Sequence, residues 1–143
     1  MRLRLFLAII FACASTGCAV GVIHLYPIEA AGVGQPQILK GTIIYAALSA
    51  TVSFRSPNGE KFSGPCAFGS AAGVNDDLKG TWDSVYGQGD YLAHVVGSQT
   101  HCTATLTGSA GTIFHLESYN ETAETPIKGI AQDSNGNIYK LGL

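Results

Sequence analysis

Three short turns that end in glycine, each flanked by residues of alternating polarity, constrain the fold of this chain most. They are the segments Pro57-Asn58-Gly59, Ser109-Ala110-Gly111 and Ser134-Asn135-Gly136. A three-residue hairpin loop is a type I turn followed by a left-handed residue, which is usually glycine. Each segment therefore predicts a β-hairpin, and the loop length fixes which residues face each other across it.

The predicted registers place apolar side chains on one face of each hairpin. The facing pairs are Ala50 with Cys66, Phe54 with Phe62, Cys102 with Ser118, Ala104 with Leu116, Leu106 with Phe114, Gly129 with Leu141 and Ala131 with Tyr139. In the first two hairpins, a shift of one residue would carry charged side chains into the core. A fourth hairpin is predicted at Gly97-Ser98, where glycine in first place suits a type II′ turn, and it would pair His94 with His101.

A further strand is predicted over residues 38–45, which brings the total to about seven or eight antiparallel strands in chain order. This count predicts an all-β fold, either a small antiparallel β-barrel or a sandwich. One short helix, about residues 76–86, interrupts the strands, because apolar residues there recur at helical spacing and Gly87 ends the pattern. These apolar residues are Leu78, Trp82, Val85 and Tyr86. We expect Trp82 to pack against an end or flank of the sheet.

The N-terminus has the order of a secretory signal. A basic start at residues 1–4 precedes an apolar run over residues 5–14, which is shorter than the roughly 20 residues of a spanning helix. The cysteine directly after Gly17 resembles the lipobox of bacterial lipoproteins, which are cut before the cysteine and acylated on it. We therefore predict a signal peptide at 1–17, a lipidated Cys18 that begins a tether over 18–36, and a single β-domain over 37–143. Glycines and prolines, Gly21 and Pro27 among them, break any regular period in the tether. Its apolar segment Leu25-Tyr26-Pro27-Ile28 either packs on the domain as an edge segment or is a loose linker.

A second cleavage site is open at the same place. Gly17-Cys18-Ala19 also fits the small-x-small site of ordinary signal peptidase. Cleavage there would start the mature chain at Val20 and leave a soluble protein, periplasmic or secreted.

The cysteines bear on this choice. Cys13 and Cys18 lie in the leader region, whereas Cys66 and Cys102 both fall on inward faces of the predicted hairpins. Two buried cysteines in an exported chain predict one disulfide between them. Cys18 is then left without a partner, which favours its use as a lipid anchor carrying palmitate-type acyl chains.

Composition and motifs argue against several functions. Of eight basic residues, two lie in the leader, so the mature chain keeps six against ten acidic ones, and nucleic acid is not an expected partner. No Gly-x-Ser-x-Gly nucleophile motif is present, and the carboxylates of Asp76 and Asp77 stand where a helix N-terminus favours negative charge. We therefore expect that the protein is not an enzyme and binds no cofactor.

Histidine supplies the one candidate metal site. His94 and His101 would oppose each other on the outer face of the predicted fourth hairpin, with His115 and Glu117 on a neighbouring strand. Imidazole and carboxylate groups on one face could bind zinc or copper. The alternative is an ordinary polar surface that carries histidines.

Several segments together resemble an uncharacterised family of small bacterial exported proteins and predicted lipoproteins. They are Leu25-Tyr26-Pro27, Trp82-Asp83-Ser84-Val85-Tyr86-Gly87, Tyr91-Leu92-Ala93-His94-Val95, Ile127-Lys128-Gly129 and Gly136-Asn137-Ile138-Tyr139-Lys140. The resemblance implies a location in the bacterial envelope and no particular activity.

The expected function is that of a non-enzymatic envelope lipoprotein. Its lipid anchor would hold a β-domain with a binding or structural role on a membrane, expected to be the outer membrane, where an envelope protein is a possible partner. One alternative is a secreted or periplasmic inhibitor of a hydrolase. Another is a carrier of a small apolar ligand, with a cavity lined by Phe54, Phe62, Phe68, Phe114 and Leu116.

Overall fold

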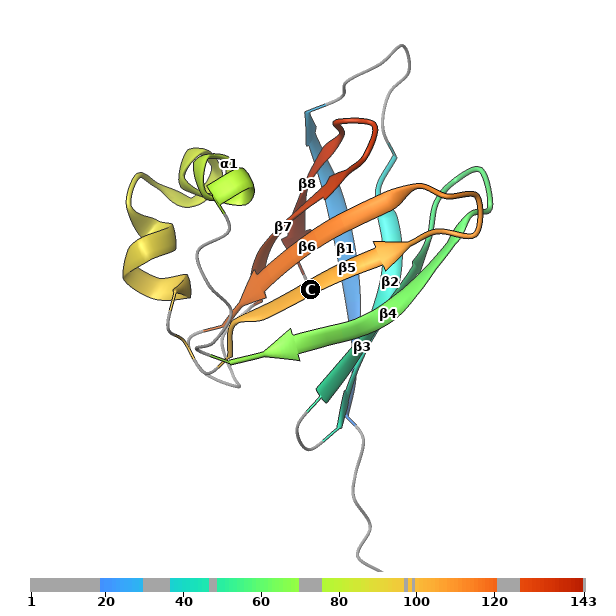
Figure 1. Ribbon diagram of the computed structural model, residues 1–143, viewed down its shortest axis with the longest axis horizontal. Helices are drawn as coiled ribbons and strands as arrows, with labels where there is room; N and C mark the ends of the chain where they lie inside the picture. Colours follow the sequence, from blue (N-terminus) through green and yellow to red (C-terminus); the bar gives the residue numbers. More distant parts are fainter. Residues whose placement is uncertain are drawn as a thin grey trace, which may run out of the picture.

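The described residues form eight antiparallel strands that pair in chain order, and the last strand pairs back with the first (Figure 1). The computed structural model describes residues 19–29, 37–46, 49–69, 76–96, 98, 100–120 and 127–142. The predicted signal peptide, Cys18 and residues 30–36 of the predicted tether lie outside this part of the chain. The strands are β1 (Ala19–Glu29), β2 (Leu39–Ala46), β3 (Ser49–Arg55), β4 (Lys61–Phe68), β5 (Cys102–Thr107), β6 (Ile113–Tyr119), β7 (Lys128–Asp133) and β8 (Ile138–Gly142).

Pairing between β1 and β8 closes the sheet into a barrel. Leu25 of β1 lies opposite Leu141 of β8, and the two strands remain paired over most of β8. A closed sheet has no free edge strand, which is the usual liability of antiparallel sheets. The all-β prediction is confirmed, and of its two architectures the chain adopts the barrel.

The three hairpin registers predicted from the glycine turns are confirmed. Phe54 lies opposite Phe62, Leu106 opposite Phe114, and Ala131 opposite Tyr139. The glycines that end the three turns have φ values of +89°, +94° and +86°, the left-handed conformation that the loop type requires.

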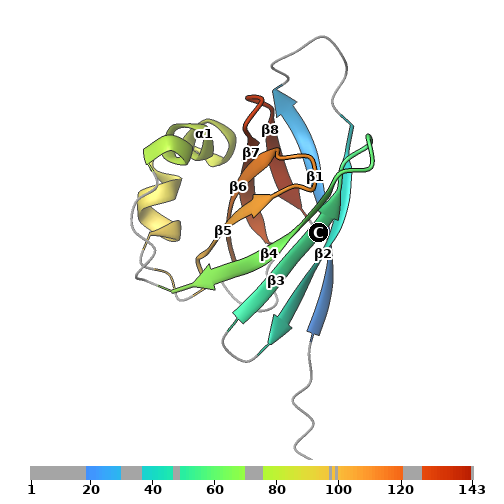
Figure 2. The same ribbon diagram turned by 45° about the vertical axis from the view of Figure 1, so that its right-hand side comes forward.

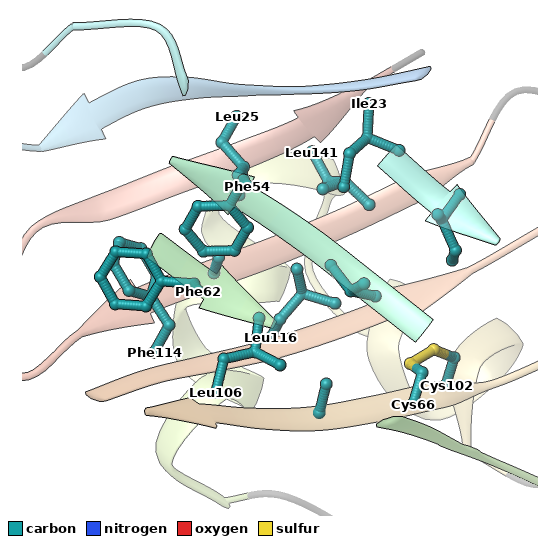
Figure 3. Close-up of a cluster of buried hydrophobic side chains, with 14 of the residues drawn as sticks. Ile23, Leu25, Phe54, Phe62, Cys66, Cys102, Leu106, Phe114, Leu116 and Leu141 are labelled. Atoms are coloured by element: carbon teal, nitrogen blue, oxygen red, sulfur yellow. A yellow bond between two sulfur atoms is a disulfide. The ribbon is translucent and has the colours of Figure 1, made fainter. Parts of the chain in front are cut away.

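The interior of the barrel is filled by side chains from all eight strands (Figure 3). Phe54, Phe62 and Phe114 form its aromatic centre, with ring centroids 4.8–4.9 Å apart in stacked and edge-on pairs. Such pairs add to the free energy gained by burying their area. The barrel is therefore a packed core.

Residues 19–29 correct one prediction. They form strand β1 of the barrel wall, so the expectation of a tether is wrong for this segment. Ile23 and Leu25 point into the core and are buried, which repeats the alternation of the other strands. Gly21 and Pro27 suggested a loop, but Pro27 sits beside a register shift in the pairing with β8, where its missing N–H is tolerated.

A helical insertion between β4 and β5 covers part of the outer wall (Figure 2). It contains helix α1 (Asp76–Tyr86), as predicted, and a short π-helix, η1 (Tyr91–Val95). Gly87 ends α1 with φ +123°. The insertion builds a second core against the wall, formed by Leu78, Trp82, Tyr91, Val95, Tyr119 and Ile130. The expectation that Trp82 flanks the sheet is confirmed.

The predicted fourth hairpin is wrong, because residues 91–95 form η1 instead of a strand. Tyr91 and Val95 are four residues apart and both are buried in the second core, while Ala93, halfway between them, is exposed. A helical turn places residues at this spacing on one face, whereas a strand also buries the residue halfway between them. Packing on the wall therefore decides the conformation.

Candidate functional site

The disulfide predicted between Cys66 and Cys102 is present, with the two Cα atoms 5.6 Å apart. Both residues are buried at the end of the barrel core, at the close of β4 and the start of β5 (Figure 3). These two strands lead into and out of the helical insertion. The disulfide therefore fastens both roots of the insertion to the same point of the wall.

Two hydrogen bonds join α1 to η1 inside the insertion. The indole Nε1 of Trp82 donates to Asp90 Oδ2 at 3.0 Å, and the backbone N–H of Tyr91 donates to Asp83 Oδ1 at 3.1 Å. The Trp82 and Tyr91 rings also meet edge-on, with centroids 5.9 Å apart. The two helices therefore form one packed unit.

A buried polar network lies between this unit and the outer wall of the barrel. Glu117 Oε1 accepts a hydrogen bond from the Tyr91 hydroxyl at 2.9 Å and lies 2.5 Å from His101 Nε2. The His101 and Glu117 side chains are both fully buried. Within the described part of the chain, His101 Nδ1 and Glu117 Oε2 have no hydrogen-bond partner.

Burial determines what this network can do. A solute cannot reach His101 or Glu117 while the insertion is in place, so the pair serves to hold the insertion on the wall. Glu117 lies on the outward face of β6, as the predicted register of its hairpin implies, but its side chain is buried, and the expectation that this face is exposed to solvent is wrong here. The outward residues of β6 near its end are covered by the insertion, and a pairing of residues 16 positions apart carries no local signal.

The two histidines of the predicted metal site do not face each other across a hairpin. His94 lies on the exposed side of η1, with Nε2 4.0 Å from Asp90 Oδ1, while His101 is committed to Glu117. His115 is exposed and its Nδ1 lies 3.2 Å from the Thr105 hydroxyl. Among the described residues, no group of three or more His, Cys, Asp or Glu side chains is placed to hold a metal ion.

Tyr86, in the last turn of α1, ties the insertion to the backbone of the barrel. Its hydroxyl accepts a hydrogen bond from the Gly129 N–H at 2.9 Å and donates one to the Gly129 carbonyl at 3.1 Å. Burial raises the pKa of this phenol, and the hydrogen bond with Gly129 opposes the rise. The ammonium groups of Lys128 and Lys140 lie 5.5 and 5.1 Å from its ring centroid, within cation–π range.

The N-terminal end of β1 is the remaining candidate, because the predicted anchor adjoins it. Ala19 begins the strand and pairs with Tyr45 of β2, so the first residue after Cys18 already belongs to the barrel. Val20 and Val22 point outward and are 63% and 57% exposed. This end of the barrel therefore presents apolar side chains beside the predicted lipidation site.

Comparison with known proteins gives no match: no protein family, no curated protein and no solved structure is similar to this chain. No helix in the described part of the chain is both long enough and apolar enough to cross a bilayer.

Proposed function

We propose that this chain is an exported bacterial lipoprotein, attached through Cys18 to an envelope membrane, expected to be the outer membrane. In this proposal the barrel is a non-enzymatic domain with a binding or structural role. The observation that carries it is the junction between leader and fold. The signal-like segment ends at Gly17, and β1 begins at Ala19, so Cys18 is the one residue between them. Acylation at this position would hold the barrel directly on the membrane.

The disulfide supports export. Disulfides persist in oxidising compartments such as the bacterial periplasm and are rare in the cytosol. The Cys66–Cys102 bond also leaves Cys18 as the one cysteine after the predicted leader without a partner in the barrel. This favours the use of Cys18 as the site of acylation.

The packed interior favours this role over a carrier of small apolar ligands. The cavity that such a carrier needs was expected between Phe54, Phe62 and Phe114, and their rings instead fill that space in mutual contact. Phe114 also meets the Tyr139 ring, with centroids 5.7 Å apart. Binding surfaces of this domain are therefore sought on its exterior.

Metabolic labelling with radioactive palmitate tests the proposal. The wild type, Cys18→Ser and Cys13→Ser chains are expressed in bacteria, and Cys13 serves as the matched control because it lies within the leader. We expect label in the wild type and in Cys13→Ser, both recovered with outer membranes, and no label in Cys18→Ser. Equal labelling of Cys18→Ser, or a soluble unlabelled wild type that begins at Val20, refutes lipid attachment.

A further inference from the structure

The outer wall of β1–β4 carries three parallel rows of side chains that change in character along the strands. Each row runs across the four strands, one residue from each, at positions fixed by the strand pairing. The row nearest the start of β1 is Val20, Ile44, Thr51 and Pro65. The middle row is Val22, Thr42, Ser53 and Ser63. The third row is His24, Lys40, Arg55 and Lys61.

The first two rows are uncharged, and their apolar members are exposed. Val20 lies opposite Ile44, which is 40% exposed, and Val22 is the next outward residue of β1. With about 3.3 Å per residue, Val20 and Val22 stand roughly 7 and 13 Å along the chain from Cys18. An acyl group on Cys18 would therefore bring these side chains to the surface of the bilayer.

The third row is basic and lies four residues further along the strands, about 13 Å from the first. Lys40 faces Arg55, and Arg55 faces Lys61, so three exposed cations stand side by side. Like charges at facing positions of a sheet are destabilising. Within the described residues none of the three forms an ion pair, and Glu60 beside them directs its carboxylate to the Ala110 and Thr112 amides. An anionic partner would relieve this repulsion.

We propose that the outer wall of β1–β4 lies on the surface of a bilayer that contains anionic phospholipids. The apolar row enters the interface beside Cys18, and the basic row binds headgroup phosphates. Interfacial apolar residues penetrate about 5–10 Å, which leaves a row 13 Å further along a tilted strand at the level of the headgroups. This inference rests on the proposed function, because the anchor at Cys18 sets the distance.

The consequence is a fixed orientation. The acyl chains hold the protein, and the wall determines which side of the barrel faces the lipid. Figures 1 and 2 show the helical insertion on the side of the barrel away from β1 and β2. In the seated barrel the insertion therefore faces away from the membrane, where an envelope partner can reach it.

Quenching of tryptophan fluorescence by brominated lipid tests the contact. The chain is purified from bacterial membranes, its acylation is read from its mass, and it is reconstituted in vesicles of phosphatidylethanolamine and phosphatidylglycerol with brominated acyl chains. The probe variant is Val22→Trp, with Ile44→Trp as a second probe on the same wall. His115→Trp on β6 is the matched control, since His115 is an exposed outward residue of the strand that stands opposite β2 in the order of the closed barrel. The native Trp82 is buried between the insertion and the barrel wall and gives the same background in all of them.

We expect strong quenching of the Val22→Trp and Ile44→Trp probes and none of His115→Trp beyond the background. The basic row is tested by the same probe in a Lys40→Gln/Arg55→Gln/Lys61→Gln chain. Each basic residue at an anionic surface raises the equilibrium constant for membrane contact about five-fold. Loss of all three should therefore lower the equilibrium constant between the wall in contact with the bilayer and the wall free of it by roughly 100-fold. The control is a Lys79→Gln/Lys128→Gln/Lys140→Gln chain, which has the same net charge as the basic-row variant. Its probe should be quenched as strongly as in the chain with all lysines and arginines intact.

The inference is overturned by equal quenching of the two walls, by no quenching in a chain whose mass shows acylation, or by an equal loss of quenching in both triple variants. The last result would indicate that membrane binding depends on the net charge of the protein and not on the position of the basic row. If the mass shows an unacylated chain, the proposed function fails. In that case the unacylated protein is added to the same brominated vesicles, and quenching of the Val22→Trp probe tests contact between the wall and the bilayer independently of the anchor. Binding to an acidic protein in place of vesicles would likewise contradict the membrane assignment.

Discussion

Reduction of the Cys66–Cys102 bond is the perturbation whose effect follows most directly from the structure. The bond joins residues 36 positions apart, and the closed loop contains the entire helical insertion. In the native state both roots of the insertion are also held by strand pairing, since Phe68 pairs with Cys102. Reduction should therefore leave the native barrel in place and act mainly by freeing the unfolded chain.

The chain-entropy relation gives the size of the effect. For a loop of this length it amounts to about 3.8 kcal/mol at 25 °C. The roughly 125 residues after the leader have an unfolding entropy of about 0.26 kcal/mol/K near 60 °C. The midpoint temperature should therefore fall by about 15 °C.

Urea unfolding of the oxidised and the reduced protein, at identical sequence, measures this difference. The reduced form is prepared by unfolding with thiol and refolding under the same thiol. A Cys66→Ala/Cys102→Ala chain, unaffected by thiol, serves as the control for the reagent. A decrease in the free energy of unfolding of less than about 1 kcal/mol on reduction would refute the entropic reasoning. If reduction speeds amide hydrogen exchange in η1 alone, the bond stabilises the folded insertion instead.

Three further predictions concern buried contacts. His101→Ala should lower the free energy of unfolding by about 3–5 kcal/mol, because the buried Glu117 carboxyl loses its imidazole partner; exposed His115→Ala should change it by under about 0.5 kcal/mol in the same denaturation assay. Burial raises the pKa of Glu60, but hydrogen bonds from the 110–112 turn outweigh it and lower the pKa below 4.5, so its stabilisation is present above pH 4.5 and lost as pH falls through the folded value. Glu60→Gln should therefore flatten the loss of stability in acid, and an unchanged acid limb contradicts this. Gly108→Ala should cost about 1–3 kcal/mol in thermal unfolding, because the added methyl meets the Glu60 carboxylate; a neutral result would mean that the carboxylate moves freely.

The candidate site was partly predictable from sequence. Cys66 and Cys102 could be paired because local turn chemistry placed both on inward faces. The Glu117–His101 contact could not be predicted, because an outward residue of a strand reads as solvent-exposed unless the element that covers it is known. The basic row was predictable only in part: the register of the first hairpin sets Arg55 opposite Lys61, whereas Lys40 joins them only through the pairing of β2 with β3.

The sequence by itself determined strands β2–β8, three hairpin registers, the short helix and the inward positions of the two cysteines that form the disulfide. These depend on residues close in the chain, where alternation and a left-handed glycine leave one arrangement that buries the apolar side chains. Tertiary structure decided the rest. Residues 19–29 become a strand because the edges of β2 and β8 need a partner, and residues 91–95 become a helix because Tyr91 and Val95 pack together on the wall. Each of these outcomes is set by pairing or packing with distant residues, whose free energy exceeds the weak local preferences of the segment.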